Sequence, residues 1–99
     1  MKIYISGKIS NTYECRQKLK KIQKDIERNG DEAVNPAAVY MMLPDGMTKK
    51  EQHDIRISLM GMCDGVIFLD GFEDDILCNQ ELSYAILHKY PITFEGGKI

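Results

Sequence analysis

Short runs of β-branched and apolar residues alternate along this chain with stretches of helical periodicity, and no other feature constrains the fold as strongly. The runs typical of strands lie at residues 2–6, 32–35, 66–69 and 91–94. A helix is predicted in each interval between them, which gives the order β-α-β-α-β-α-β. Such alternation favours a parallel sheet with helices on both faces. We therefore expect a three-layer α/β sandwich whose sheet has four to five strands, in the order 2-1-3-4.

The first and third predicted helices have recognisable ends. Ser10 or Asn11 is expected to cap the first helix, and Asn29-Gly30 ends it as a C-terminal glycine cap does. The third helix is predicted over residues 75–89, directly after an acidic turn. These boundaries leave short connections, which suit a small α/β domain.

Length and charge exclude several classes of protein. The chain has 99 residues, a formal net charge of −2 and no apolar segment long enough to cross a membrane. These values predict one domain over residues 1–99, with neither nucleic acid nor membrane as partner. The N-terminus is too short in apolar residues for a signal peptide, and three cysteines without C-x-x-C spacing argue against a disulfide framework. We therefore expect a cytoplasmic location, where thiols stay reduced.

Glu81 stands where a charge is not expected. It falls within the apolar stripe that Leu77, Leu82 and Ala85 form along the third helix. A carboxylate there is costly unless it is paired, protonated or faces a cavity. Asp75, at the start of the same helix, is a second carboxylate in the turn after the third strand. The pair indicates a site, unless Glu81 lies at the edge of the stripe and reaches solvent or a lysine.

The predicted sheet also places a crevice. Ligands of parallel sheets bind beyond the carboxyl ends of the strands, where the strand order reverses. In the order 2-1-3-4 that point lies between the first and third strands, so Ser6-Gly7 and Asp75 should face one crevice. Ser6-Gly7-Lys8 could cradle a phosphate or a base there, because glycine lets the backbone approach closely. The segment matches neither a P-loop nor G-x-G-x-x-G, so an ordinary turn explains it equally well.

The second helix carries charges whose simplest interpretation is structural. Thr48 followed by Glu51 fits a capping box that begins this helix. Asp54 and Arg56 are most simply exposed charges on an amphipathic helix, with Arg56 an outside candidate for contact with a phosphate. The inward residues are expected to be Ile55, Leu59 and Met62. No spacing of histidine, acid and hydroxyl residues predicts a catalytic triad, a metal site or a cofactor.

Several short motifs, in this order and spacing, resemble one known superfamily. They are Tyr4-Ile5-Ser6-Gly7, Val34-Asn35-Pro36-Ala37, Cys63-Asp64, and Gly71-Phe72-Glu73-x-Asp75 followed by Glu81. Together they cover nearly the whole chain and resemble the small nucleoside 2-deoxyribosyltransferase-like proteins, most of all a small branch common in phages and bacteria. The resemblance implies a flavodoxin-like, Rossmann-like fold.

The resemblance also implies roles for individual residues. In that superfamily a Glu near the start of the last helix is the nucleophile that attacks the anomeric carbon of a deoxyribonucleoside, and Glu81 occupies its position. Asp75 matches an acid or serine that contacts sugar or base, and Tyr4 matches a tyrosine that orients the nucleophile. The chain departs from the family where Arg56 replaces a frequent Asp, and where bulkier residues at 77–79 replace small ones.

We therefore expect processing of a nucleoside or nucleoside monophosphate at its N-glycosidic bond, by 2-deoxyribosyl transfer or by hydrolysis. A carboxylate beneath the anomeric carbon stabilises or bonds to the developing cation, and a second acid assists the leaving base. The catalytic residues would be Glu81 and Asp75. The expected substrate-binding residues are Tyr4, Ser6, Gly7, Lys8, Asn35, Arg56 and Phe72. A non-catalytic nucleotide-binding module and an interaction protein with a degenerate site remain as alternatives.

One apolar segment suggests self-association. Residues 37–47 are expected to form an ordered loop with one helical turn, because Pro44 and Asp45-Gly46 interrupt them. Within it, residues 39–43 carry more hydrophobic surface than a short loop should expose. We expect a homodimer or larger homo-oligomer with this segment or the second helix at the interface, and the resemblance implies the same.

Overall fold

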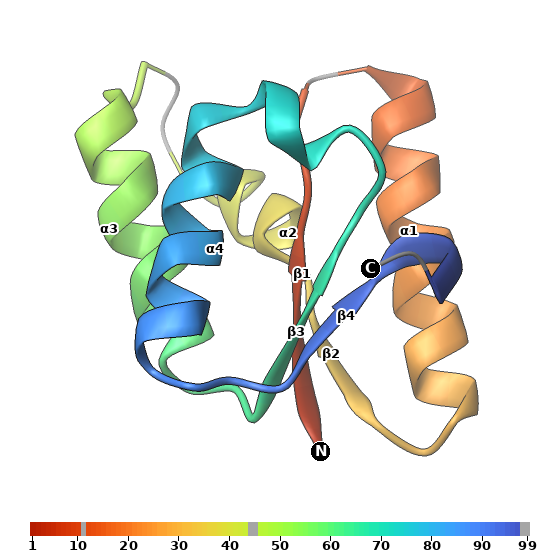
Figure 1. Cartoon of the computed structure of the whole chain (residues 1–99). Coiled ribbons are helices and arrows are strands. Elements are labelled where there is room, and N and C mark those ends of the chain that lie inside the picture. Colours follow the sequence, from red (N-terminus) through yellow and green to blue (C-terminus); the bar gives the residue numbers. More distant parts are fainter. Residues whose placement is uncertain (11, 44–45, 98–99) are drawn as a thin grey trace.

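A parallel sheet of four strands lies at the centre of the computed structural model, which describes residues 1–10, 12–43 and 46–97 (Figure 1). The strands are β1 (Lys2–Ser6), β2 (Glu32–Val34), β3 (Gly65–Phe68) and β4 (Ile92–Phe94). They lie in the order β2-β1-β3-β4, and every neighbouring pair is parallel. The predicted strand order is confirmed.

Helices cover both faces of this sheet, as the alternating sequence predicts. They are α1 (Tyr13–Arg28), α2 (Pro36–Tyr40), α3 (Lys49–Met60) and α4 (Ile76–Leu87), with 3-10 turns η1 (Phe72–Asp74) and η2 (Glu95–Gly97). Helix α1 lies on one side of the sheet, and α3 and α4 lie together on the other (Figure 1). The expected three-layer arrangement is therefore present. No helix in the described part of the chain is long and apolar enough to span a membrane.

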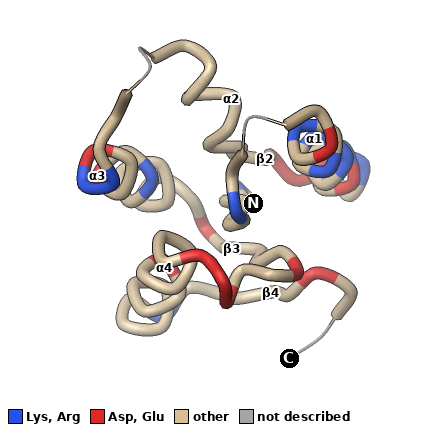
Figure 2. The backbone as a smooth tube through the Cα atoms, turned by 90° about the horizontal axis from the view of Figure 1, so that it is seen from above, with Lys and Arg blue, Asp and Glu red and all other residues tan. Residues whose placement is uncertain are grey.

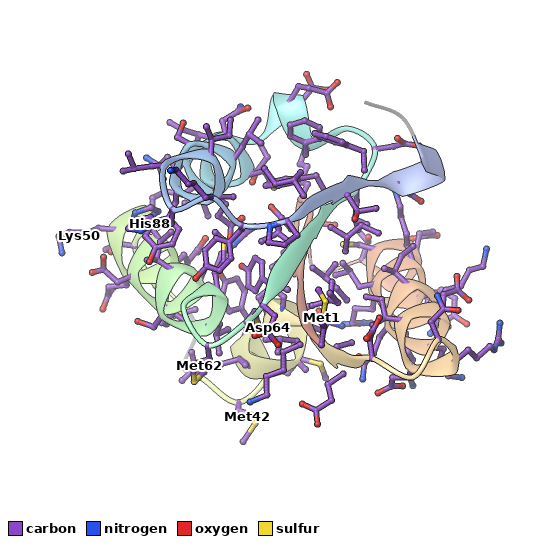
Figure 3. The ribbon with its side chains drawn as sticks, turned by 60° about the horizontal axis from the view of Figure 1, so that its bottom comes forward. Met1, Met42, Lys50, Met62, Asp64 and His88 are labelled. Atoms are coloured by element: carbon purple, nitrogen blue, oxygen red, sulfur yellow. The ribbon has the colours of Figure 1, made fainter. Side chains whose placement is uncertain are left out.

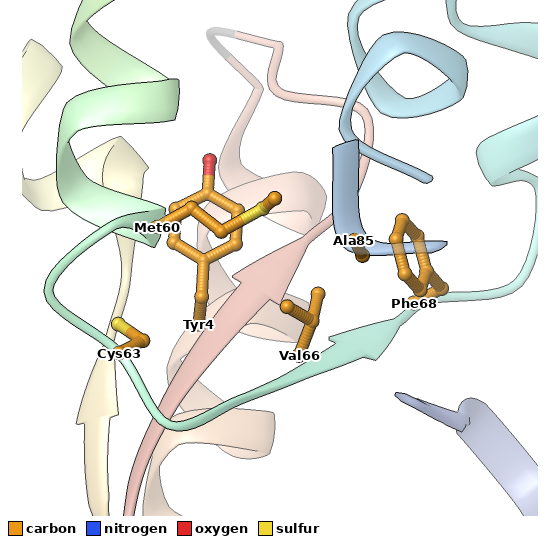
Figure 4. Packing of buried hydrophobic residues seen from close by; sticks show 6 residues of the cluster. All are labelled: Tyr4, Met60, Cys63, Val66, Phe68 and Ala85. Atoms are coloured by element: carbon orange, nitrogen blue, oxygen red, sulfur yellow. The ribbon is translucent and has the colours of Figure 1, made fainter. Parts of the chain in front are cut away.

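Strand β1 distributes its side chains between two separate cores. Successive residues of a strand point to opposite faces, so Tyr4 and Ser6 share one face and Ile5 the other. Ile5 packs with Leu19 and Ile26 of α1. Tyr4 packs beneath α3 and α4, with Met60, Cys63, Val66, Phe68 and Ala85 (Figure 4). Both Tyr4 and Ser6 are completely buried, which sets two hydroxyl groups beneath the α3 and α4 layer.

The helix boundaries follow their capping residues. Thr12 caps α1 and its Oγ1 accepts from the Cys15 N–H at 3.2 Å, so the expectation of Ser10 is wrong, and Asn11 lies outside the described residues. Thr48 and Glu51 form the predicted capping box of α3, with bonds of 3.1 and 2.9 Å. Part of the segment predicted as a loop with one helical turn is the short helix α2.

Candidate functional site

A buried carboxylate lies at the centre of the molecule. Glu81 projects from α4 toward the sheet and is completely buried. The Tyr4 hydroxyl donates to its Oε2, and the Ser6 hydroxyl donates to its Oε1 at 2.9 Å. Arg56 completes the set, with Nε 3.1 Å from Oε2 and Nη2 2.5 Å from Oε1. Glu81 therefore faces inward as predicted, and a buried arginine rather than a lysine or solvent compensates its charge.

Arg56 is the largest departure from the sequence-based expectation. It was expected on the exposed face of its helix, but only 1% of it is exposed. Its guanidinium also donates to the Gly7 carbonyl at 3.3 Å, to the Tyr4 hydroxyl at 3.2 Å and to Cys78 Sγ at 3.6 Å. The prediction was wrong because the inward face of α3 carries Arg56 and Met60, whereas Met62 is 61% exposed. The apolar residues four and seven positions after Arg56, Met60 and Cys63, were the signal that could have placed it inside.

This environment fixes the protonation of the groups around Glu81. Burial, reinforced by the negative charge of Glu81, raises the pKa of Tyr4 well above its ordinary range, so Tyr4 remains a phenol that donates. Burial alone would lower the pKa of Arg56, but the Tyr4 oxygen and the Glu81 carboxylate outweigh it and raise that pKa. Burial raises the pKa of Cys78 to about 12, so this residue is a thiol rather than a nucleophilic thiolate.

Asp75 lies at the edge of the cluster rather than inside it. It is the N-cap of α4, and its Oδ2 accepts from the Cys78 N–H at 3.1 Å. Its side chain is only half-buried, and it makes no direct hydrogen bond to Glu81. The Cys78 thiol accepts from Arg56 and also interacts with the Asp75 carboxylate. Figure 2 shows the acidic turn that leads into α4.

The remaining predicted residues divide into those the structure gathers and those it does not. Gly7 joins the cluster through its carbonyl, and a Cβ there would lie 2.8 Å from Leu69 Cδ1, which explains why a glycine fits. Lys8 is exposed and lines a different hollow of about 250 Å³, together with Asp70. Asn35 caps α2, because its Oδ1 accepts from the Ala37 N–H at 3.0 Å.

Phe72 also lies outside the hydrogen-bonded cluster. Its ring packs against Phe68 and Phe94, with centroids 5.2 and 5.7 Å apart. This contact joins η1 to the ends of β3 and β4. Phe72 thus has a packing role in the structure.

A cavity of about 370 Å³ lies beside α2. Its walls include Tyr40, Met41 and Met47, and its polar groups include Ser10, Arg16 and Gln52. The Tyr40 hydroxyl is buried and has no hydrogen-bond partner of ordinary geometry among the described residues. It nevertheless lies near Arg56, whose charge opposes the rise that burial causes in the pKa of Tyr40. Sequence reasoning missed this residue, which connects the cavity to the buried ion pair.

The cavity has features common to small-molecule sites. Apolar and aromatic walls with a few converging polar groups are typical of such pockets. None of the residues that line it belongs to the set around Glu81, so the carboxylate is covered in this conformation. Among the described residues, no three His, Cys, Asp or Glu side chains gather as metal ligands do.

The fold has a solved counterpart. The 2-deoxyribosyltransferase from the psychrotolerant bacterium Bacillus psychrosaccharolyticus, described as a biocatalyst for the synthesis of antiviral and antitumoral nucleosides, superposes with a TM-score of 0.76. The match covers 100% of this chain and 76% of that one, at 16% sequence identity. At this identity the likeness establishes the shared fold, and in that respect the predicted resemblance is confirmed.

Sequence comparison gives a narrower result. No curated protein matches the chain. A family model described as "Domain of unknown function (DUF4406)" matches residues 1–94. Because this match spans nearly all of the sequence, the chain belongs to the DUF4406 family.

Proposed function

We propose that this protein binds a nucleoside or nucleoside monophosphate and acts on its N-glycosidic bond, by 2-deoxyribosyl transfer or by hydrolysis. The observation that carries the proposal is the buried Glu81 carboxylate, held by two hydroxyl groups at the carboxyl end of β1. That position adjoins the reversal of strand order between β1 and β3, where ligands of this kind of sheet bind. The protein that shares the fold is described as a 2-deoxyribosyltransferase for the synthesis of nucleosides, which supports a nucleoside as the class of substrate here.

The proposed chemistry assigns Glu81 as nucleophile. The bond between the anomeric carbon and the base nitrogen breaks, and its electron pair leaves with the base. Asp75 would give the base a proton, and a Glu81 oxygen would bond to the anomeric carbon. Water or a second base then attacks the anomeric carbon, gives its proton to the Asp75 carboxylate and displaces Glu81, which leaves both acids as they began. Tyr4, which donates to Oε2, would keep the carboxylate oriented throughout.

Catalysis by Glu81 requires that Arg56 release at least one carboxylate oxygen. Both oxygens are engaged by Arg56 in this conformation, and Glu81 is completely buried. The cavity beside Tyr40 is bordered by a residue whose hydroxyl lies near the Arg56 guanidinium. An anionic group bound there would compete with Glu81 for Arg56 and uncover the nucleophile. Ser6, Gly7 and Lys8 are the other candidates for contact with a phosphate.

The decisive test compares base release by three proteins. The unaltered chain, Glu81→Gln and the control Glu73→Gln are incubated with deoxynucleosides and their monophosphates, and free base is measured by chromatography. We expect base release from the unaltered chain and from Glu73→Gln, whose exposed carboxylate lies in the acidic turn. Glu81→Gln should release none. Full activity in Glu81→Gln would end the mechanism.

A 2′-fluoro nucleoside provides an independent readout. Fluorine slows the loss of the sugar from a glycosyl-enzyme, so the intermediate should accumulate. Mass spectrometry of the digested protein should then place the added mass on the peptide that contains Glu81. Modification of another carboxylate would assign the nucleophile elsewhere.

A second function is favoured by the fact that Arg56 donates hydrogen bonds to both oxygens of the Glu81 carboxylate. An arginine that occupies both oxygens of a buried acid is a stable structural arrangement, which suits a binding module that has no chemistry. In that case the cavity beside Tyr40 would still capture a nucleotide. A thermal-shift panel of nucleotides separates the cases, because a ligand that binds only the folded state raises Tm. Higher Tm without base release supports the binding module, and no response to any nucleotide supports an interaction protein with a degenerate site.

A further inference from the structure

Gln52 leaves α3 on the same side as Arg56, one helical turn nearer the start of the helix. Residues four positions apart lie one above the other on a helix, about 6 Å apart along its axis. Arg56 is buried against Glu81, whereas Gln52 is half-buried and lines the cavity beside α2. Lys50, two positions before Gln52, projects away from the molecule (Figure 3) and pairs with Asp54 at 3.0 Å. Gln52 therefore belongs to the inward side of α3.

The orientation of the Gln52 amide is fixed by a backbone carbonyl. Its Nε2 donates to the carbonyl oxygen of Met47 at 3.4 Å. A carbonyl oxygen can only accept, so the amide nitrogen must face Met47 and the amide oxygen must point away from it. No donor among the residues that the structure describes bonds to that Oε1 atom. Gln52 thus keeps an unused hydrogen-bond acceptor on a side chain that lines the cavity.

The rest of the cavity suits a flat ring with a polar edge. Tyr40 contributes an aromatic wall, and five side chains contribute apolar ones: Ile9, Ala37, Met41, Leu43 and Met47. A nucleobase has two apolar faces, on which aromatic side chains stack well. The other polar side chains of the cavity leave the acceptor role to Gln52. Arg16 carries only donors, and the Ser10 hydroxyl is already engaged with Thr12 Oγ1 at 3.1 Å.

The cavity and the buried carboxylate are placed as the two halves of a nucleoside require. The Tyr40 hydroxyl lies near the Arg56 guanidinium, which in turn holds Glu81. Gln52 is one turn away along the same helix. A sugar whose anomeric carbon reaches Glu81 would then hold its base in the cavity, with the edge opposite the sugar toward Gln52. In adenine and cytosine that edge carries an exocyclic amino group, whereas in guanine and thymine it carries an oxygen.

We propose that Gln52 selects nucleosides whose base carries an exocyclic amino group at the edge opposite the sugar, which means adenine or cytosine nucleosides. The inference rests on the proposed function, because it takes the sugar to lie at Glu81. The amino group donates to Oε1 and completes the hydrogen bonding of the Gln52 amide. A carbonyl oxygen in the same place sets an acceptor against an acceptor, which disfavours guanine and thymine.

The first test compares ligands that differ by that amino group alone. Deoxyadenosine is compared with purine 2′-deoxyriboside, and deoxycytidine with 2-pyrimidinone 2′-deoxyriboside, by calorimetric titration of the whole chain. In one pair the amino nucleoside should bind about tenfold more tightly, as one neutral hydrogen bond allows. The pair that responds identifies the base as adenine or cytosine. Equal dissociation constants within both pairs, or no binding by any of these nucleosides, would overturn the inference.

A variant of Gln52 tests the residue itself. Gln52→Met removes the amide with little change in side-chain length, so both members of the responding pair should bind with the same affinity. Gln80→Met is the matched control, because Gln80 is an exposed glutamine of α4 that does not line the cavity. It should keep the tenfold preference, and circular dichroism checks that both variants are folded. A preference that survives in Gln52→Met would assign the recognition to another residue.

Free base is measured in each titrated sample, so that this inference and the proposed chemistry can fail separately. A preference for the amino nucleoside without base release supports the role of Gln52 and ends the chemistry. Base release with the same kcat/KM for both members of each pair leaves the chemistry standing and ends the role of Gln52.

Discussion

At the scale of single residues, Arg56 and Glu81 each offset the free-energy cost of burying the other. A buried charge loses its hydration, and the loss is compensated only when the partner and additional hydrogen bonds are well placed. Here Tyr4, Ser6 and the Gly7 carbonyl supply those additional bonds. Removal of either charge would therefore leave the other one buried without its counter-charge.

The first prediction concerns the removal of one member of this pair. An unpaired inward carboxylate would favour a stabilising Glu81→Gln, but the presence of Arg56 reverses that sign. Glu81→Gln leaves a buried guanidinium without its counter-charge and should lower the free energy of unfolding by about 3–5 kcal/mol. The double variant Arg56→Met, Glu81→Leu removes both charges and should lose less than either single change. Urea denaturation measures these differences, and a loss below 1 kcal/mol in Glu81→Gln would contradict the prediction.

The second prediction concerns the buried thiols at high pH. Burial raises the pKa of Cys78 to about 12 and that of Cys63 to about 11, against about 8.5 in an unfolded chain. The folded state therefore holds these protons more tightly, and stability should fall as the pH rises above about 8.5. The fall in Tm between neutral and alkaline pH should be smaller in Cys78→Ala than in the unaltered chain. Parallel slopes for the two proteins would show that the Cys78 thiol does not contribute.

At the scale of elements, the sequence locates helices and strands well but locates their faces less reliably. The capping box at Thr48 is confirmed because both of its bonds are local. The inward face of α3 was misassigned because Arg56, a charged residue, takes an apolar position. Periodicity counts only apolar residues, so a paired charge in the core shifts the apparent stripe. The inward face of α4 was assigned correctly, because Glu81 interrupts an otherwise unambiguous apolar face.

The third prediction separates the two roles of Asp75. As the N-cap of α4 it accepts from the Cys78 N–H, and asparagine caps as well as aspartate does. Asp75→Ala should therefore cost about 1 kcal/mol of stability, whereas Asp75→Asn should cost little. If Asp75 also protonates the leaving base, Asp75→Asn should still lose base release. Thermal unfolding and base release measured on both variants distinguish the roles, and an active Asp75→Asn would leave only the cap.

At the scale of the whole molecule, the strand order could be predicted from the sequence, whereas the ion pair that covers the Glu81 carboxylate could not. The strand order follows from alternation and from general rules for parallel sheets, which need no side-chain detail. The contact between Arg56 and Glu81 joins two helices, and no sequence pattern links these two positions. Tyr40 was missed for a similar reason, because its position beside Arg56 depends on the course of α2. Only the three-dimensional arrangement brings these groups together.

The fourth prediction concerns cooperativity. The cluster ties β1, α3 and α4 together through buried polar groups, and none of these can be exposed separately without leaving the others unpaired. Unfolding in denaturant should therefore be a single transition, with the same midpoint by circular dichroism and by tyrosine fluorescence. Two separate midpoints would show that α4 or α1 unfolds independently.

The span of the buried cluster also governs the order in which the protein can be built. Tyr4 leaves the ribosome well before its partner Glu81, which follows 77 positions later. Until α4 arrives, a nascent chain that packs α3 against β1 would enclose the Arg56 guanidinium without a counter-charge. Closure of so long a loop is slow, and the intermediate gains little from early collapse. The native sheet should consequently form only after α4 has been synthesised and supplies the missing charge.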